Sequence, residues 1–149
     1  MREIKFRVWD KVSKKYRKFD GMHDTMMMIN KDGKVEYYNL QNGSGGDEYI
    51  LEQFTGLHDA TKWEDLTDAE RDEWVKAGHT KEDWKGRRIF EGDVVLVEKF
   101  RKGVIRCLEK EALFAVDFSS HLLRLCDTTS DYIEIIGNIH DNEELLEEK

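Results

Sequence analysis

The sequence predicts a mainly β protein, with an N-terminal β meander followed by a C-terminal SH3-like β-barrel. Two observations carry this prediction: short segments in which apolar and polar side chains alternate, and turns marked by glycine, asparagine or aspartate. The length of 149 residues suits one domain with a core of its own. Because 38% of the residues are charged, we expect a highly charged, solvated surface.

The N-terminal part reads as a series of strands and tight turns. Ile4, Phe6 and Val8 alternate with more polar neighbours, which indicates a half-buried strand. The Asp32-Gly33 pair is a hairpin signal, because glycine tolerates the positive φ that such a turn requires. Strands are expected at residues 4–9, 16–19, 26–30, 35–40 and 49–54.

The composition changes at residues 60–85, which we interpret as a helical insertion. Thr67 is followed three residues later by Glu70, a spacing typical of a capping box. We therefore expect an amphipathic helix over residues 67–76, ended by Gly78, and a short turn around residues 82–84. The apolar residues of the insertion fall roughly at helical spacing: Trp63, Leu66, Ala69, Trp74 and Val75.

After Gly86 the alternating pattern returns. The turn at residues 91–93, followed by a run of valines, is typical of the opening of an SH3-like barrel. A second turn is expected at residues 101–103, and Asp141 or Asn142 is expected to cap a short helix that ends near Leu146. Strands are expected at residues 89–90, 94–100, 104–108, 112–118 and 132–139.

Charge and cysteine content narrow the choice of partners and compartment. The net charge of −8 argues against non-specific binding to nucleic acid or anionic membranes, and it fits a basic partner protein. Cys107 and Cys126 lie in apolar surroundings and are expected to be reduced, buried, structural thiols. Without an N-terminal apolar segment or a run of about 20 apolar residues, the expected location is the cytoplasm, with no membrane association.

Four blocks of sequence, spread from one end of the chain to the other, resemble the YopX family. They are MREIKFRVWD at residues 1–10, QFTGLHD at 53–59, GRRIFEGDVV at 86–95 and IEIIGNIHDN at 133–142. The resemblance implies a mostly β protein of phages and prophages, a family with no assigned biochemical activity. It therefore supplies no catalytic residue to carry over.

The chain departs from the family pattern between its second and third blocks. In the family these blocks are nearly adjacent, whereas here residues 60–85 separate them and hold three of the four tryptophans. We accordingly divide a single YopX-like domain into an N-terminal meander (1–59), a helical insertion (60–85) and a C-terminal barrel with a short helix (86–149).

Three His-Asp pairs are candidate metal or acid–base sites: His23-Asp24, His58-Asp59 and His140-Asp141. Adjacent residues of a strand point to opposite faces, so the pattern favours ordinary turn and surface residues. His58 and Asp59 are the best of the three, and a metal-dependent enzyme using them is kept as an alternative. No metal or cofactor is otherwise expected.

Two further chemical motifs are weak. Cys126 and His121 lie five residues apart beside Asp127, but the sequence shows no nucleophile–base geometry. The glycine-rich segment at residues 43–46 is followed by acidic residues, where a phosphate-binding loop requires a lysine and a hydroxyl.

A basic and aromatic stretch at residues 84–110 raises the alternative of a single-stranded nucleic-acid-binding module. The ordinary reading is a charged barrel surface, because glutamates are interspersed. The residues that would bind are Lys85, Arg87, Arg88, Lys99, Arg101 and Lys102.

The insertion supplies the main hypothesis. Tryptophans often anchor protein interfaces, although Trp63, Trp74 and Trp84 could equally pack the insertion onto the barrel. The sequence therefore predicts a non-enzymatic phage or prophage accessory protein that binds a protein partner or further copies of itself.

Overall fold

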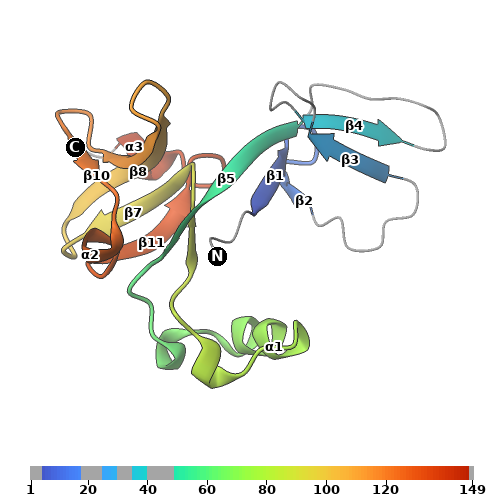
Figure 1. Cartoon of the computed structure of the whole chain (residues 1–149), viewed down its shortest axis with the longest axis horizontal. Helices are drawn as coiled ribbons and strands as arrows, with labels where there is room; N and C mark the ends of the chain where they lie inside the picture. Colours follow the sequence, from blue (N-terminus) through green and yellow to red (C-terminus); the bar gives the residue numbers. More distant parts are fainter. Residues whose placement is uncertain (1–4, 18–24, 30–34, 40–48, 148–149) are drawn as a thin grey trace. The chain divides into compact units, whose positions relative to one another are not determined.

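A computed structural model gives the architecture and describes residues 5–17, 25–29, 35–39 and 49–147 (Figure 1). The chain is mainly β, as predicted, with a small helical content. It divides into two compact units, one of Ile4–Gln53 and one that contains Phe54–Lys149. In the described residues the elements are β1 (Phe6–Asp10), β2 (Lys15–Arg17), β3 (Thr25–Ile29), β4 (Val35–Asn39), β5 (Tyr49–His58), η1 (Trp63–Asp65), α1 (Asp68–Lys76), η2 (Lys81–Asp83), β6 (Arg88–Phe90), β7 (Asp93–Val97), β8 (Arg101–Leu108), β9 (Leu113–Asp117), β10 (Leu122–Arg124), α2 (Asp127–Ser130), β11 (Ile133–Asn138) and α3 (Glu144–Glu147).

In the N-terminal unit, β1 lies between β2 and the first part of β5, and both pairings are antiparallel. β3 and β4 form a separate antiparallel pair, which confirms the predicted hairpin arms. The Asp32-Gly33 turn between them lies outside the described residues.

A buried ion pair ties this first sheet together. The register sets Arg7 opposite Glu52, whose side chain is only 4% exposed. Arg7 Nε donates to Glu52 Oε1 at 2.8 Å, and the Tyr16 hydroxyl donates to the same oxygen at 2.7 Å. The Arg7 guanidinium also lies 4.5 Å from the centre of the Tyr16 ring. Because the buried carboxylate has both a cation and a hydroxyl donor, its desolvation is offset.

The C-terminal unit is built on a five-stranded antiparallel sheet in the order β10-β9-β8-β7-β11, curled into a half-barrel (Figure 1). The second part of β5, residues 54–58, pairs with β6. Gly56 has a φ of +90°, and the β5–β6 register shifts on either side of it. This irregularity carries β5 on to His58, four residues beyond the predicted end.

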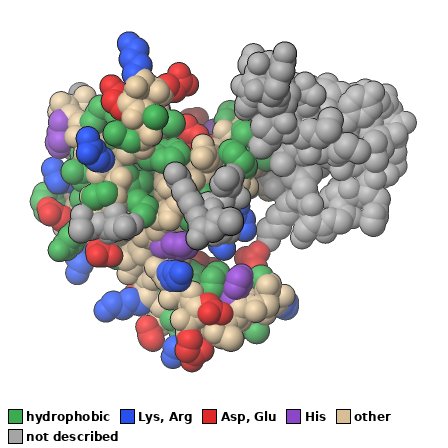
Figure 2. Space-filling view, in the orientation of Figure 1, with side chains coloured by type: hydrophobic (Ala, Val, Ile, Leu, Met, Phe, Trp, Pro, Cys, Tyr) green, Lys and Arg blue, Asp and Glu red, His purple; other side chains and the backbone are tan. Residues whose placement is uncertain are grey.

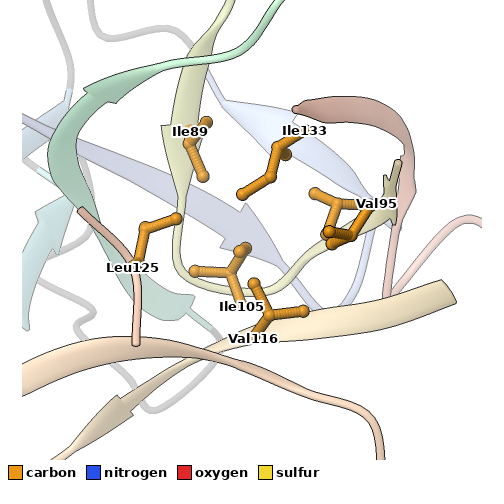
Figure 3. Close-up of a cluster of buried hydrophobic side chains, with 7 residues drawn as sticks. Ile89, Val95, Ile105, Val116, Leu125 and Ile133 are labelled. Carbon is orange, nitrogen blue, oxygen red and sulfur yellow. The ribbon is translucent and has the colours of Figure 1, made fainter. Parts of the chain in front are cut away.

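The core of this unit is a cluster of aliphatic side chains from several strands. Figure 3 shows them pointing toward one another, and five of them, Ile89, Val95, Ile105, Val116 and Ile133, are fully buried. Val97 and Leu125 complete the cluster. Burying a side chain of this size stabilises the fold by about 1.5–3 kcal/mol, so the curled sheet has a substantial core of its own.

The predicted turn at residues 101–103 is wrong, because these residues begin β8. The chain turns at residues 98–100 instead, where Glu98 and Lys99 take φ values of +54° and +70°. Gly103 lies inside the strand, because a Cβ there would come within 2.5 Å of the Val116 side chain. The glycine therefore permits close packing between strands rather than a turn.

Two short elements differ from the predicted pattern. β10 and α2 were not predicted, and together they occupy most of the segment expected to be a loop around His121 and Cys126. α3 begins at Glu144, as a short helix in the predicted place. In the part of the chain that the structure describes, no helix is long and apolar enough to cross a membrane.

Candidate functional site

The insertion begins and ends at a buried carboxylate, that of Asp59. Asp59 is 4% exposed. Its Oδ1 accepts the backbone N–H groups of Thr61 at 3.0 Å and Arg87 at 2.8 Å. Its Oδ2 accepts the Thr61 hydroxyl at 2.8 Å and the backbone N–H of Ile135 at 3.1 Å. One side chain therefore connects both ends of the insertion to β11.

The backbone closes at the same point. Asp59 donates its N–H to the carbonyl of Arg87 at 2.8 Å, and Ala60 donates to the carbonyl of Ile133. Gly86 has a φ of +113°, and a Cβ there would lie 2.0 Å from the Asp59 carbonyl oxygen. Only glycine fits such a position, for reasons of both conformation and space. We call Asp59, Gly86 and Arg87 the clasp.

The helix of the insertion confirms the capping prediction. Thr67 is the N-cap of α1, with the side-chain bonds of a capping box to Glu70. The C-terminal end is also as predicted, since Gly78 has a φ of +93°. The expected amphipathic face is weak: none of the α1 residues is buried, and Val75 is 57% exposed.

Polar contacts hold α1 to its surroundings, in addition to the ring contacts of Trp74. Arg87 donates to both carboxylate oxygens of Glu70, at 3.0 and 3.1 Å. This ion pair holds the pKa of Glu70 below its ordinary value and raises that of Arg87. Arg71 donates to the carbonyl oxygens of Trp63 and Glu64. The helix is therefore attached both to the clasp and to η1.

The three tryptophans of the insertion pack together. The ring centre of Trp84 lies 6.2 Å from that of Trp63 and 5.2 Å from that of Trp74, both in edge-to-face arrangements. Trp74 also stacks on His79 at 4.1 Å. The indole N–H of Trp84 donates to the Thr61 carbonyl at 2.9 Å, and that of Trp74 donates to the Thr80 carbonyl at 2.7 Å.

Trp63 differs from the other two. All three side chains are half-buried, but within the described residues the Trp63 indole N–H has no hydrogen-bond acceptor. Trp74 and Trp84 are thus fixed by ring contacts and a hydrogen bond each, whereas Trp63 keeps a free donor beside solvent. Trp74 and Trp84 therefore fit the interpretation that the tryptophans pack the insertion. Trp63 fits the interpretation that a tryptophan anchors an interface.

A solvent-open cleft of about 570 Å³ lies at the base of the insertion. Trp63 and Trp84 contribute its aromatic surface, and Asp59 of the clasp lies at its edge. Charges of both signs surround the indoles, and Lys81 lies 3.9 Å from Glu64. The remaining lining residues are Ala60, Thr61, Lys62, Glu64, Lys81, Lys85 and Asp131. The rings of such a cleft can bury an apolar side chain of a partner, and the surrounding hydrogen-bonding and charged groups can fix the orientation of that side chain.

A smaller hollow of about 280 Å³ shares two lining residues with this cleft, Ala60 and Asp131. Its surface is mostly apolar, and Tyr132 is 63% exposed beside it. The two hollows together extend the candidate surface from the insertion to the ends of β7 and β11.

The basic residues predicted to bind nucleic acid fall into separate local environments. Arg87 pairs with Glu70, and the Arg88 guanidinium lies 5.9 Å from the ring centre of Trp74. Arg101 lies over the Phe118 ring at 4.9 Å, in the sheet, and Lys99 is exposed in the turn before it. Lys85 lines the cleft, and Lys102 follows Arg101 on β8. Figure 2 likewise shows positive and negative side chains interspersed on the face in view.

The geometry argues against a metal site at His58 and Asp59. The Asp59 carboxylate already accepts four hydrogen bonds, and the His58 ring packs edge-on against Phe54 at 5.5 Å. Within the described ranges, no three His, Cys, Asp or Glu side chains are grouped to hold a metal ion. His140 and Asp141 lie in a turn whose backbone N–H groups both donate to the Asn138 side chain. The pair His23-Asp24 lies outside the described residues.

Both cysteines are free thiols. Burial raises the pKa of Cys107, which lowers its reactivity. The prediction that Cys126 is buried is wrong, because this residue is exposed. Its Sγ lies 3.0 Å from the Thr129 hydroxyl, whereas His121 contacts Ser120 and Arg101. The glycine-rich segment at residues 43–46 lies outside the described residues.

Fold and site together define a small, mainly β protein with a helical insertion and an open, tryptophan-lined cleft. Residues 78–147 match the family model of the YopX protein, which confirms the resemblance to the YopX family. The crystal structure of protein YopX from Bacillus subtilis has a similar fold, with a TM-score of 0.51 and 18% sequence identity. That match covers 100% of this chain and 99% of the other. No curated protein matches the sequence.

Proposed function

We propose that this chain is a non-enzymatic accessory protein of a phage or prophage, and that its insertion binds a protein partner in the bacterial cytoplasm. The observation that carries the proposal is the cleft beside Trp63, in which an aromatic ring and an unused indole N–H face solvent. Tryptophan is enriched among the residues that dominate protein interfaces, because one side chain supplies a large apolar area and a donor.

The rigidity of the site supports a binding role. Trp84 and Trp74 are fixed by hydrogen bonds to backbone carbonyls, and the clasp fixes both ends of the insertion. A surface that is already ordered loses little conformational entropy when a partner docks. The chain's net charge of −8 favours a partner with a basic surface around the inserted side chain.

The test is affinity capture from host lysate with the full chain as bait, comparing wild type, Trp63→Ala and Val75→Ala. Val75 is an exposed apolar residue of the same insertion that does not line the cleft, so it is the matched control. We expect wild type and Val75→Ala to retain the same protein, and Trp63→Ala to bind it at least about 30-fold more weakly, as for an interface hot spot.

Sedimentation of the purified chain tests whether the partner is a second copy. Concentration-dependent association that Trp63→Ala abolishes would identify the chain itself as the partner. Equal retention by Trp63→Ala, or a strict monomer that captures nothing, would refute the proposal.

A further inference from the structure

The smaller hollow, of about 280 Å³, lies where β7 and β11 run side by side. Leu96, Tyr132 and Ile133 supply its apolar surface. The register pairs Glu134 of β11 with Leu96 of β7, so these two side chains lie on the same face of the sheet. Ile133 belongs to the buried core, whereas Tyr132 is 63% exposed. Folding of the chain therefore leaves one aromatic ring of this hollow largely uncovered.

A second exposed ring lies beside the hollow. Phe100 is 71% exposed and directly follows Glu98 and Lys99, which both line the hollow. The backbone fixes this arrangement, because Glu98 donates its N–H to the Tyr132 carbonyl at 2.9 Å. Phe100 in turn donates its N–H to the Val97 carbonyl at 3.3 Å. One surface thus presents an apolar ring and an apolar hollow next to each other.

The charges around the hollow have both signs. Its lining contains three carboxylates and one ammonium group, those of Glu98, Asp131, Glu134 and Lys99. Within the described ranges, none of these four side chains forms an ion pair. Arg87 lies near Glu134, but its guanidinium is already paired with Glu70. A partner that covers the hollow must therefore bring a cation for its acidic side and an anion for its lysine.

We propose that a second copy of this chain covers the hollow, with Phe100 of each copy inserted into the hollow of the other about a two-fold axis. A ring beside a hollow is self-complementary under such a rotation, because each copy supplies what the other lacks. The same rotation brings Lys99 of each copy toward Asp131 and Glu134 of the other, so the unpaired charges attract. The inference rests on the proposed function, in which this candidate surface binds protein, and it names the occupant of the smaller hollow.

The size of the exposed rings indicates a weak, reversible dimer. A large aromatic side chain buries about 150–250 Å², and roughly two-thirds of each ring is available here. Phe100 and Tyr132 from two copies then contribute roughly 400–700 Å². Stable interfaces begin near about 1,200 Å², so residues around the rings must supply the rest. We therefore expect a dissociation constant in the micromolar range.

Sedimentation equilibrium of the full chain, at concentrations of about 1–200 μM, tests the proposal. We expect monomer and dimer without larger species, because a two-fold contact closes on itself. Phe100→Ala should raise the dissociation constant at least about ten-fold, as for an interface hot spot. Leu122→Ala is the matched control, since Leu122 is an exposed apolar residue on β10, at the opposite edge of the same sheet, and should leave association unchanged.

Charge reversal tests the two-fold arrangement. Lys99→Glu and Glu134→Lys should each dimerise more weakly than wild type, because each variant sets like charges against each other at both contacts. A mixture of the two variants should form a heterodimer about as readily as wild type dimerises, since every contact then joins opposite charges. A mixture that associates no better than either variant alone would overturn the arrangement.

Trp63→Ala separates this inference from the proposed function, because Trp63 lines the larger cleft and not the hollow. It should leave self-association unchanged. Association that Trp63→Ala abolishes and Phe100→Ala retains would place the self-contact at the cleft, which would overturn this inference and support the proposed function. A strict monomer that still captures a lysate protein through Trp63 would have the same meaning. Thermal melts that match wild type confirm that each variant is folded.

Discussion

Replacing Asp59 with alanine should unfold the C-terminal unit at a markedly lower urea concentration. The substitution removes the acceptor for three backbone N–H groups, those of Thr61, Arg87 and Ile135. Thr61 lies beside the open cleft and can turn to water, so we assign it no cost. Arg87 and Ile135 lose charge-assisted bonds worth about 1.5–3 kcal/mol each, which gives a loss of about 3–6 kcal/mol. A typical domain has about 5–15 kcal/mol of stability in total, so the effect is large.

Asp59→Asn provides an internal comparison. Its carbonyl oxygen can keep the bonds at the Oδ1 position, but its amide N–H₂ then faces the N–H of Ile135, donor against donor. We expect about half the loss seen with alanine. Asp72→Ala is the control, because Asp72 is exposed on α1 and should change stability by less than about 0.5 kcal/mol.

Urea titrations followed by tryptophan fluorescence suit this test, because three of the four tryptophans lie in the insertion that Asp59 closes. Far-UV circular dichroism reports the sheet in the same samples. If Asp59→Ala unfolds within about 1 kcal/mol of wild type, the hydrogen bonds at the clasp are not what stabilises this unit. If asparagine is as harmful as alanine, the number of acceptors does not determine the loss.

Three further predictions concern backbone conformation and one ion pair. Gly86→Ala should lower the free energy of unfolding by about 3 kcal/mol and Gly78→Ala by about 1 kcal/mol, because both have positive φ but only Gly86 is also crowded; equal losses in thermal melts would contradict this. Glu70→Gln should cost about 0.5–1 kcal/mol at pH 7 by removing the ion pair to Arg87. Because folding lowers the pKa of Glu70, the ion pair stabilises the fold at neutral pH, and this stabilisation is lost as the pH falls through the lowered pKa. The melting temperatures of wild type and Glu70→Gln should therefore converge at acidic pH. A difference in melting temperature that stays constant with pH would refute this linkage. Lys99→Gly should raise the melting temperature, with a gain of up to about 1 kcal/mol from relieving a φ of +70°; a decrease would show that the lysine side chain supports the turn.

The sequence identified most strands and the helix because their signals are local. Alternation places β1, and the Thr67–Glu70 spacing places the start of α1. The short β10 and α2 were missed, because three or four residues are too few to show a period. The turn after β7 was misplaced for a tertiary reason: Gly103 looks like a turn residue, but the contact that requires it comes from Val116 on the neighbouring strand.

The candidate site was only partly predictable. The tryptophans lie within one short segment, so their grouping follows from the sequence, but which indole N–H stays free depends on where the carbonyls of Thr61 and Thr80 fall. The basic stretch was predicted as one surface, whereas the structure separates Arg87, which is held by Glu70, from Arg101, which lies over the Phe118 ring. Linear proximity does not show which strand faces a residue or which carboxylate pairs with it.

The blocks by which the chain resembles the YopX family share one feature in the C-terminal unit: each contains polar side chains that bind backbone groups. In the block at residues 53–59, the Thr55 hydroxyl donates to the Ile89 carbonyl at 2.8 Å, and Asp59 closes the insertion. In the block at 86–95, the Asp93 carboxylate accepts the N–H of Phe90 at 2.8 Å.

The block at residues 133–142 follows the same rule. Asn138 accepts the N–H groups of His140 and Asp141, both at 2.9 Å, and Asn142 accepts that of Asn138 at 3.2 Å. A Cβ on Gly137 would come within 2.3 Å of the Asn142 side-chain oxygen, so the glycine makes room for that turn. Side chains committed to backbone groups in this way specify the fold and have few lone pairs left for chemistry. Apart from Asp59, the residues that line the insertion cleft lie outside the blocks, and they are the ones available to a ligand.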